Sequence, residues 1–532
     1  MSQAAGIAFA RVRKGHTGRV VVYMSDGEMQ EGQTWEAVQA LVFHKIPLIA
    51  VVDVNGQQCD GLMKDVCSVG SIANKLKAFG AVVREVDGHN VKDIDAALSQ
   101  TTHDGPLFVL CHTDPTRGFP LLKTRAPKLH YIRFKDENEK QQWKDVLASM
   151  PVSRITSTDT NQEEVQPEKP VIVQDSTSDT TTPTPLQQCP VLSNSKTVTR
   201  PHRSQLRRWM EKHPKAIVLT ADLTSSCEVD LVRDKLPSQY LSMGMAEQNM
   251  MSFAGGLARE GFRPFIHTFG VFVTRRPFDQ VAMSIGVPNL PVRLLGFLPG
   301  LTTPGGVTHQ AIDDIALMRS IPNMRILDVG DATEVESVLD VADAIDGPVY
   351  IRMLRGEVPR LFPQQCPMKF GVPRLLSKSE DSDVVIITSG ICTEEALQAK
   401  KMIQSSGVSI LHLHLSTIIP FPDEHILKVC NMSKYGIITM ENHLVTGGIG
   451  SSTAEVLAEH AVAKRLIRLG VQNTYAHGAS KEYLLKEYGF DALALISAIE
   501  KLVHRKLIKD CNVVEDKEQD LDMNKLNRPE DL

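Results

Sequence analysis

The chain has no uninterrupted apolar stretch of membrane-spanning length in its 532 residues, so the sequence predicts no transmembrane helix. It also has no strong charge imbalance. Its 58 basic and 63 acidic residues give a net charge of -5, which provides no electrostatic reason to expect binding to nucleic acid or to an anionic membrane. The basic cluster Arg11–Lys14 follows the apolar start of the chain, the reverse of the order in a secretory signal. We therefore expect a cytoplasmic protein.

The nine cysteines show no metal-ligand spacing, and their number is odd. Such a distribution is typical of reduced thiols rather than of a disulfide framework. We expect no disulfide.

The length is sufficient for three or four domains. Short apolar strands alternate with helical patterns in residues 1–150, and the same alternation returns in 199–366 and 367–505, which predicts parallel sheets covered by helices. Residues 151–198 are rich in Ser, Thr and Pro and read as a flexible linker, and 506–532 form an acidic tail. The predicted fold class is therefore α/β, with three doubly wound parallel-sheet domains.

Two successive apolar runs end in polar residues. The run 20–24 is followed by Asp26, and the run 47–52 is followed by Asn55. Two parallel strands would bring these side chains together at their carboxyl ends, where open α/β sheets bind ligands. Carboxylate and amide oxygens suit magnesium, which retains diphosphate oxygens and water in its shell. The alternative is that both residues merely cap helices.

Motifs elsewhere in the chain extend this pattern, and together they resemble the transketolase family, whose members depend on thiamine diphosphate. In chain order the motifs are Asp26–Gly32, Trp35–Ala37, Val86–His89, Met245–Asn249, Thr308–Gln310 and Arg352–Arg355. The resemblance covers nearly the whole chain.

The resemblance implies a different role for each domain. Residues 1–150 would be the diphosphate-binding domain, truncated at its front, 199–366 the pyrimidine-binding domain and 367–505 the family's C-terminal domain. It implies thiamine diphosphate and Mg²⁺ as cofactors, a homodimer with shared active sites, and transfer of a two-carbon ketol unit between sugar phosphates, as in the pentose phosphate pathway.

The resemblance also assigns the metal and diphosphate contacts. Asp26, Asn55 and the backbone carbonyl of Gln57 would hold Mg²⁺, and Gly27 would lie against the diphosphate. Ser25 stands where the family pattern has Gly, a small change that leaves room for close approach.

Glu247 is the predicted catalytic acid, because a buried carboxyl with a raised pKa can share a proton with the pyrimidine ring and drive its imino tautomer. Four methionines lie close to it in the sequence and suggest an apolar setting: Met243, Met245, Met250 and Met251. Phe269 and Phe272 match the aromatic segment that stacks on the pyrimidine, although core packing is the alternative for both.

Three further residues match positions near the substrate. His89 is similar to a catalytic histidine near the diphosphate and the substrate hydroxyls, and His309 to one that helps to place the substrate. Arg355 matches an arginine that holds a sugar phosphate, with Arg352 as the fallback.

Two departures affect the donor site, since the family has a histidine where this chain has Phe297 and an aspartate where it has Gly305. One alternative is therefore a related enzyme that decarboxylates a 2-oxo acid, similar to deoxyxylulose phosphate synthase. Another is a catalytically impaired paralogue or subunit. The start of the chain resembles the interior of a family helix, so we expect a separate subunit or a longer reading frame to supply the preceding segment. Without it the strand 19–24 would expose apolar surface and an open edge.

Overall fold

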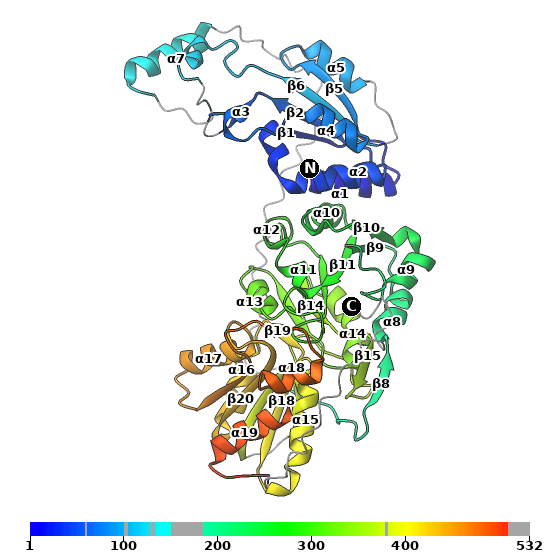
Figure 1. The fold of residues 1–532 in the computed structure, drawn as a ribbon, viewed down its shortest axis with the longest axis vertical. Coiled ribbons are helices and arrows are strands. Elements are labelled where there is room, and N and C mark those ends of the chain that lie inside the picture. The colour runs from blue at the N-terminus through cyan, green and yellow to red at the C-terminus, as the bar shows by residue number, and fades with distance from the viewer. Residues whose placement is uncertain are drawn as a thin grey trace. The chain divides into compact units, whose positions relative to one another are not determined.

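The computed structural model describes residues 1–58, 61–99, 105–126, 129, 134–149, 185–377 and 381–508 (Figure 1). The chain divides into two compact units, which we call the small unit and the large unit. The small unit consists of Val21–Val38 and Ile49–Pro183, and the large unit of Met1–Val20, Gln39–Leu48 and Thr184–Leu532. None of the helices in the described ranges is both long and apolar enough to cross a membrane.

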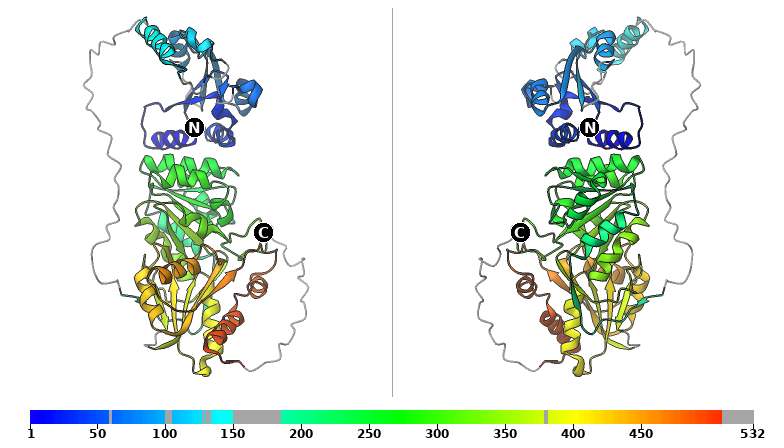
Figure 2. Two further views of the ribbon diagram at one scale, coloured as in Figure 1. Left: turned by 90° about the vertical axis from the view of Figure 1, so that its left-hand side faces the viewer. Right: turned by 90° about the vertical axis from the view of Figure 1, so that its right-hand side faces the viewer.

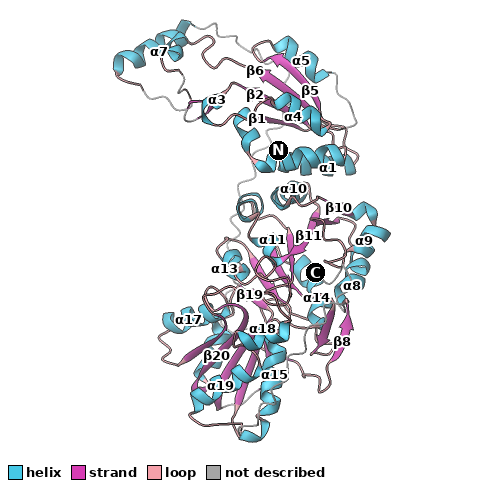
Figure 3. Ribbon diagram, in the orientation of Figure 1, coloured by secondary structure: helices cyan, strands magenta, loops and turns pink. Residues whose placement is uncertain are grey.

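The small unit contains a four-stranded sheet in the order β1-β2-β6-β5, and all of its pairs are parallel (Figure 3). The strands are β1 (Val21–Ser25), β2 (Ile49–Val54), β5 (Val82–Asp87) and β6 (Leu107–His112). Two helices accompany them, α4 (Ile72–Phe79) and α5 (Val91–Ser99). β1 is an edge strand, and Val21 and Tyr23, which share one of its faces, are 53% and 72% exposed. This strand therefore offers uncovered apolar surface beside unpaired backbone groups.

The first sheet of the large unit has seven strands in the order β10-β9-β11-β12-β14-β13-β19. All are parallel except β19, which runs antiparallel to β13. The strands are β9 (Ala216–Thr220), β10 (Tyr240–Ser242), β11 (Arg263–Phe269), β12 (Arg293–Phe297), β13 (Arg325–Asp328), β14 (Val349–Met353) and β19 (Thr417–Ile419).

The second sheet of the large unit has the order β21-β20-β17-β18-β16-β7. It is parallel except where β16 meets β18. The strands are β7 (Gln187–Gln188), β16 (Arg374–Ser377), β17 (Ser382–Ser389), β18 (Ile410–Leu415), β20 (Ser433–Leu444) and β21 (Leu466–Val471). One apolar core joins this sheet to the first, since buried residues from Leu206 to Leu502 belong to a single cluster.

Part of the predicted linker is folded. Besides β7, it contains β8 (Lys196–Thr199), which pairs antiparallel with β15 (Glu357–Arg360). The rest of the predicted linker to residue 184, and the predicted tail from residue 509, lie outside the described residues.

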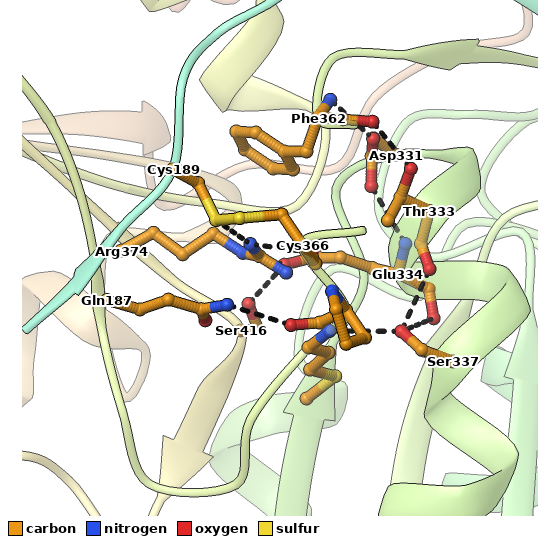
Figure 4. Close-up of a disulfide and its surroundings, with 12 residues drawn as sticks. Gln187, Cys189, Asp331, Thr333, Glu334, Ser337, Phe362, Cys366, Arg374 and Ser416 are labelled. Carbon is orange, nitrogen blue, oxygen red and sulfur yellow. Dashed lines mark hydrogen bonds and ion pairs between the residues drawn. A yellow bond between two sulfur atoms is a disulfide. The ribbon is translucent and has the colours of Figure 1, made fainter. Parts of the chain in front are cut away.

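The expectation of no disulfide is wrong, because Cys189 and Cys366 are bonded, with 6.2 Å between their Cα atoms (Figure 4). The pairing of β7 with β16 brings Cys189 back beside the segment that follows β15. The partners are 177 residues apart in the chain, so only tertiary structure brings them together. Arg374 donates from Nη1 to Cys189 Sγ at 3.2 Å and from Nε to Glu334 Oε1 at 2.8 Å.

Glycines fix the helix that carries the predicted catalytic acid. Helix α1 (Ser2–Arg13) packs on α10 (Glu247–Arg259) within the large unit (Figure 2). A Cβ atom at Gly6 would lie 2.2 Å from the Phe253 carbonyl oxygen, and one at Gly256 would lie 2.2 Å from the Gln3 carbonyl oxygen. Both positions therefore require Gly, and the close approach fixes the position of α10 against α1.

Candidate functional site

The strand ends of the small unit place Asp26 and Asn55 as the sequence predicts. Ser25 pairs with Asp53 in the β1–β2 register, so the residues that follow both strands emerge at the same edge of the sheet. Asp26 is 1% exposed, and its Oδ2 accepts from the Gly56 amide at 2.7 Å. Asn55 Oδ1 accepts from the Gln57 amide at 2.8 Å.

The capping alternative for Asp26 does not fit the local geometry. The short 3₁₀ helix Asp26–Gln30 has Ser25 as its N-cap, in a capping box with Glu28. The Ser25 amide donates to Glu28 Oε1 at 3.1 Å, so Ser25 and Glu28 already serve the start of this helix. The Asp26 carboxylate is thus available for another role.

The arrangement fits a hard cation. Asp26 Oδ1 is buried without a hydrogen-bond partner among the described residues, and leaving such an oxygen unpaired is costly. Burial raises the pKa of Asp26, and the nearby Gly56 amide opposes this rise. In the described parts of the chain no group of three or more His, Cys, Asp or Glu side chains could hold a metal. One carboxylate with amide and carbonyl oxygens suits Mg²⁺, which takes its remaining ligands from phosphate and water.

A cavity of about 410 Å³ lies over these residues. Its walls include Asp26, Asn55, Gly56, Lys64 and His112. Gly27 lies in the 3₁₀ helix, where a Cβ atom would meet only the side chains of Ser25 and Gln58, at 3.6 and 3.7 Å. The space beside Asp26 is therefore open to a ligand.

His89 lies at the same edge of the sheet, after β5, and is exposed. Its Nε2 accepts from the Asp114 amide at 2.8 Å, which leaves Nδ1 to carry the proton in the neutral ring. In the sheet order, β2 and β6 separate β5 from β1. The structure thus puts His89 at the edge that bears Asp26, without contact between the two.

In the large unit, Glu247 is the first residue of α10 and is only 5% exposed. Met250 and Met251 are fully buried on the same helix, whereas Met245 is 78% exposed and is not part of an apolar enclosure. Glu247 Oε1 accepts from Arg276 Nη1 at 2.9 Å. The sequence motif predicted the burial of this acid but not its cationic partner.

The predicted aromatic contacts form one cluster with His309. The ring centroids of Phe269 and Phe272 are 5.8 Å apart, and His309 lies 6.0 Å from the first and 5.5 Å from the second. Arg276 Cζ lies 4.1 Å from the Phe272 centroid, and Arg355 Cζ 5.8 Å from that of Phe269. Since Arg276 also bonds Glu247, all five predicted residues of the large unit are connected. Phe269 also belongs to the apolar core, so the core alternative holds for it as well.

Arg355 lines a second cavity, of about 480 Å³, within the large unit. Its Nη1 donates to the Ser226 carbonyl at 3.1 Å, and Arg200, Ser225 and Lys481 line the same cavity. Three cationic side chains share the walls of this cavity with three acidic ones, Glu228, Glu357 and Glu394, so their formal charges balance.

The fallback assignment to Arg352 is wrong. Its side chain is 1% exposed and pairs with Asp314 at 2.8 Å and Asp328 at 3.1 Å, so it cannot reach a substrate.

The two residues that depart from the family pattern lie in different surroundings. Phe297 is fully buried, with its ring 5.5 Å from that of His202, whereas a Cβ atom at Gly305 would lie 3.1 Å from the Cβ of His309.

Sequence reasoning missed Arg276, Arg200 and Lys481. The doubled basic residue after Thr274 was a usable signal for Arg276, because it lies four residues beyond Phe272, in the turn that follows the helix Gly270–Thr274. Arg200 and Lys481 come from distant parts of the chain, and no local pattern links them to Arg355.

Three domain profiles of the transketolase family match the chain. They are the thiamine diphosphate binding domain over 12–152, the pyrimidine binding domain over 197–360 and the C-terminal domain over 374–495. A putative uncharacterized transketolase family protein from Sinorhizobium fredii is 34% identical over 302 residues, covering 57% of this chain and 87% of the relative. This chain belongs to the transketolase family.

Two further relatives match it over different spans. Transketolase from Rattus norvegicus is 28% identical, over 91% of this chain and 76% of the relative. A 1-deoxy-D-xylulose-5-phosphate synthase from Prochlorococcus marinus is 30% identical, over 55% of this chain but 45% of the relative.

Two solved transketolase structures resemble this one. A split gene transketolase, described as an inactive beta4 tetramer, matches with a TM-score of 0.52 and 34% identity, over 57% of this chain and 98% of that structure. Transketolase from Campylobacter jejuni matches with a TM-score of 0.70 and 16% identity, over 95% of this chain and 81% of that structure. The predicted α/β fold of the transketolase type is therefore confirmed.

Proposed function

We propose that this protein uses thiamine diphosphate and Mg²⁺ to transfer a two-carbon ketol unit between sugar phosphates. The observation that carries the proposal is the connected cluster of the large unit, in which Arg276 joins the buried acid Glu247 to two stacked aromatic rings, which in turn contact a histidine and Arg355. The cluster combines the groups that activate a cofactor with a cation suited to a phosphate.

Bound thiamine diphosphate supplies a nucleophilic carbon that can cleave and form bonds next to a carbonyl group. In our proposal Asp26, Asn55 and the carbonyl of Gln57 hold the Mg²⁺ ion, and Gly27 leaves room beside it. The carboxyl of Glu247 holds the proton that it shares with the pyrimidine ring, while Phe272 and Phe269 orient that ring.

The substrate contacts complete the proposal. His309, which contacts both phenylalanine rings, would orient the substrate, and His89 in the small unit of a second copy would contact its hydroxyl groups. Arg355 would bind the phosphate, since a guanidinium can grip that group through two hydrogen bonds. Arg200 and Lys481 add positive charge in the same cavity.

We propose a homodimer as the working form. Several large apolar side chains of the large unit are exposed, which supports burial against a second copy. They are Val12 at 52%, Phe43 at 75%, Met245 at 78%, Met283 at 58% and Val287 at 69%. Separately, the edge of β1, with Tyr23 exposed, supports pairing with a strand from another polypeptide, and a relative of known structure is described as a split gene transketolase.

A related decarboxylating reaction is the second candidate. It is favoured by Phe297, which is buried in the core where the family has a donor-binding histidine, and by Gly305, which provides no carboxylate beside His309. Without that histidine and that carboxylate, the protein would have to recognise a sugar donor through other side chains. A 2-oxo acid such as pyruvate has no sugar hydroxyl groups, so its recognition does not require them.

Products from a mixed panel of sugar phosphates and pyruvate, measured by mass spectrometry, test both candidates. Two-carbon exchange without loss of carbon dioxide supports ketol transfer, and pyruvate consumption with release of carbon dioxide supports the second candidate. Glu247→Gln should bind the cofactor almost normally and lower turnover by about a hundredfold or more, the scale of lost acid–base assistance. If the variant is as active as the wild type, Glu247 has no part in the reaction.

The same assay, run on the chain alone and with an added subunit that pairs with the edge of β1, tests the partner proposal. We expect weak cofactor binding and little turnover from the chain alone. Robust turnover without any added subunit would refute the need for one.

A further inference from the structure

We infer that Arg276 is an internal competitor for the pyrimidine subsite, which the cofactor must displace in order to bind. The inference rests on the proposed function. Two of the three groups assigned to the pyrimidine ring, Glu247 and Phe272, are already engaged by this one side chain. Its Nη1 donates to Glu247 Oε1 at 2.9 Å, and its Cζ lies 4.1 Å from the Phe272 ring centroid.

The guanidinium of Arg276 offers the same kinds of contact as the pyrimidine ring that would displace it. A guanidinium is flat, carries N–H donors in its plane and stacks on aromatic faces. An aminopyrimidine is also flat, offers N–H groups in its plane to a carboxylate and stacks on the same kind of face. The Phe272 face that Arg276 covers can stack on only one of the two partners at a time, and both partners would bond the same Glu247 carboxylate.

Arg276 is free to leave this position, unlike its neighbour. Its side chain is 52% exposed, whereas Glu247 is 5% exposed, so the arginine can return to water while the acid stays in place. The adjacent Arg275 is only 29% exposed and is held by Asp313 through Nε at 3.0 Å. The chain thus provides a matched control in the preceding residue.

Displacing Arg276 costs free energy, and this cost should lower the affinity for the cofactor. An ion pair between a buried acid and a half-exposed arginine is worth more than an exposed pair, and a close cation–π contact adds to it. Removing the Arg276 side chain should therefore tighten cofactor binding, roughly threefold to tenfold. Arg276→Lys, which keeps the charge but not the planar fork, should have an intermediate effect.

Isothermal titration of the full-length chain measures this directly, with thiamine diphosphate in excess Mg²⁺ as one probe and thiamine alone as the other. Thiamine has the pyrimidine ring but no diphosphate, so a similar fold gain with both probes assigns the effect to the ring. Arg275→Ala should leave both affinities unchanged.

The outcomes separate this inference from the proposed function. Tighter binding by Arg276→Ala than by the wild type, with Arg275→Ala unchanged, supports the inference. Equal binding by wild type and Arg276→Ala overturns it, and weaker binding by the variant overturns it as well, because Arg276 would then contact the bound cofactor. If neither protein binds thiamine diphosphate even with the added subunit present, the proposed function fails together with the inference.

Discussion

The guanidinium of Arg355 lies over the ring of Phe269, with 5.8 Å between Cζ and the ring centroid. This contact lies within the large unit and joins Arg355, which is predicted to bind a phosphate, to Phe269, which is predicted to stack on the pyrimidine. Arg355 also lines the cavity that Arg200 and Lys481 line, so it joins the aromatic cluster to two further cationic side chains. A substrate with its reacting carbonyl near the aromatic rings could direct an anionic tail to this arginine.

Arg355→Ala should therefore raise KM for phosphorylated sugars by about tenfold or more, because a charge-assisted hydrogen bond is lost. Unphosphorylated sugars should be affected much less. Steady-state kinetics with matched phosphorylated and free sugars provides the measurement. Arg360→Ala, which removes an arginine paired with Glu336 at 2.7 Å, is the control. Equal losses for both classes of sugar would show that Arg355 does not read phosphate.

Asp26→Asn should abolish Mg²⁺-dependent binding of thiamine diphosphate while leaving the small unit folded. The amide can still accept from Gly56 through its oxygen, but it supplies no negative charge to a cation. Calorimetry with and without Mg²⁺ checks this, with circular dichroism to monitor the fold. Asp93→Asn, on the exposed side of α5, should bind like the wild type. Wild-type affinity in Asp26→Asn would refute the metal assignment.

Periodicity and motif order were enough to predict the fold class and the strand ends that carry Asp26 and Asn55. Both depend on local patterns, namely apolar runs followed by polar residues at sheet edges. They could not predict that β19 leaves the third region to join the second region's sheet, because strand pairing across domains has no local signature.

The partners of individual side chains could not be predicted from the sequence either. Arg352 and Arg355 are three residues apart and chemically identical, yet one is buried between two aspartates and the other lines a cavity. Which of them faces a ligand depends on β14, whose last residue is Met353, and on acids from distant segments. The Arg276–Glu247 pair was missed for the same reason.

The disulfide between Cys189 and Cys366 predicts a redox-dependent stability. Breaking a cross-link between residues 177 positions apart increases the entropy of the unfolded chain. This typically lowers the free energy of unfolding by about 2–4 kcal/mol. Peptide mapping under non-reducing conditions should recover the linked pair, and dithiothreitol should lower Tm. Cys189→Ser should have the low Tm without reductant, whereas Cys67→Ser, at an exposed free cysteine, should behave like the wild type. A Tm insensitive to reductant would contradict the stabilising role.

The buried pair His202 and His267 predicts a loss of stability in acid. Their Nε2 atoms lie 3.1 Å apart, and burial lowers the pKa of His267 to about 4, against opposition from the Phe265 carbonyl. The unfolded chain takes up this proton near pH 6.5 while the folded chain does not, so the free energy of unfolding falls as pH drops from 6.5 towards 4. For His267 alone the loss should reach about 2 kcal/mol by pH 5.

His267→Gln isolates this contribution, because glutamine does not titrate. The variant should be less stable than the wild type at pH 7.5, since it loses packing in a fully buried position. The difference in Tm should narrow as pH falls below 6.5, because only the wild type then pays for keeping the imidazole neutral. Buried carboxyls such as Glu441, with a pKa raised by burial to about 7, have the opposite pH dependence but are present in both proteins and cancel in the difference. A difference in Tm that stays constant from pH 7.5 to pH 5 would show that His267 takes up its proton equally in the folded and unfolded chains.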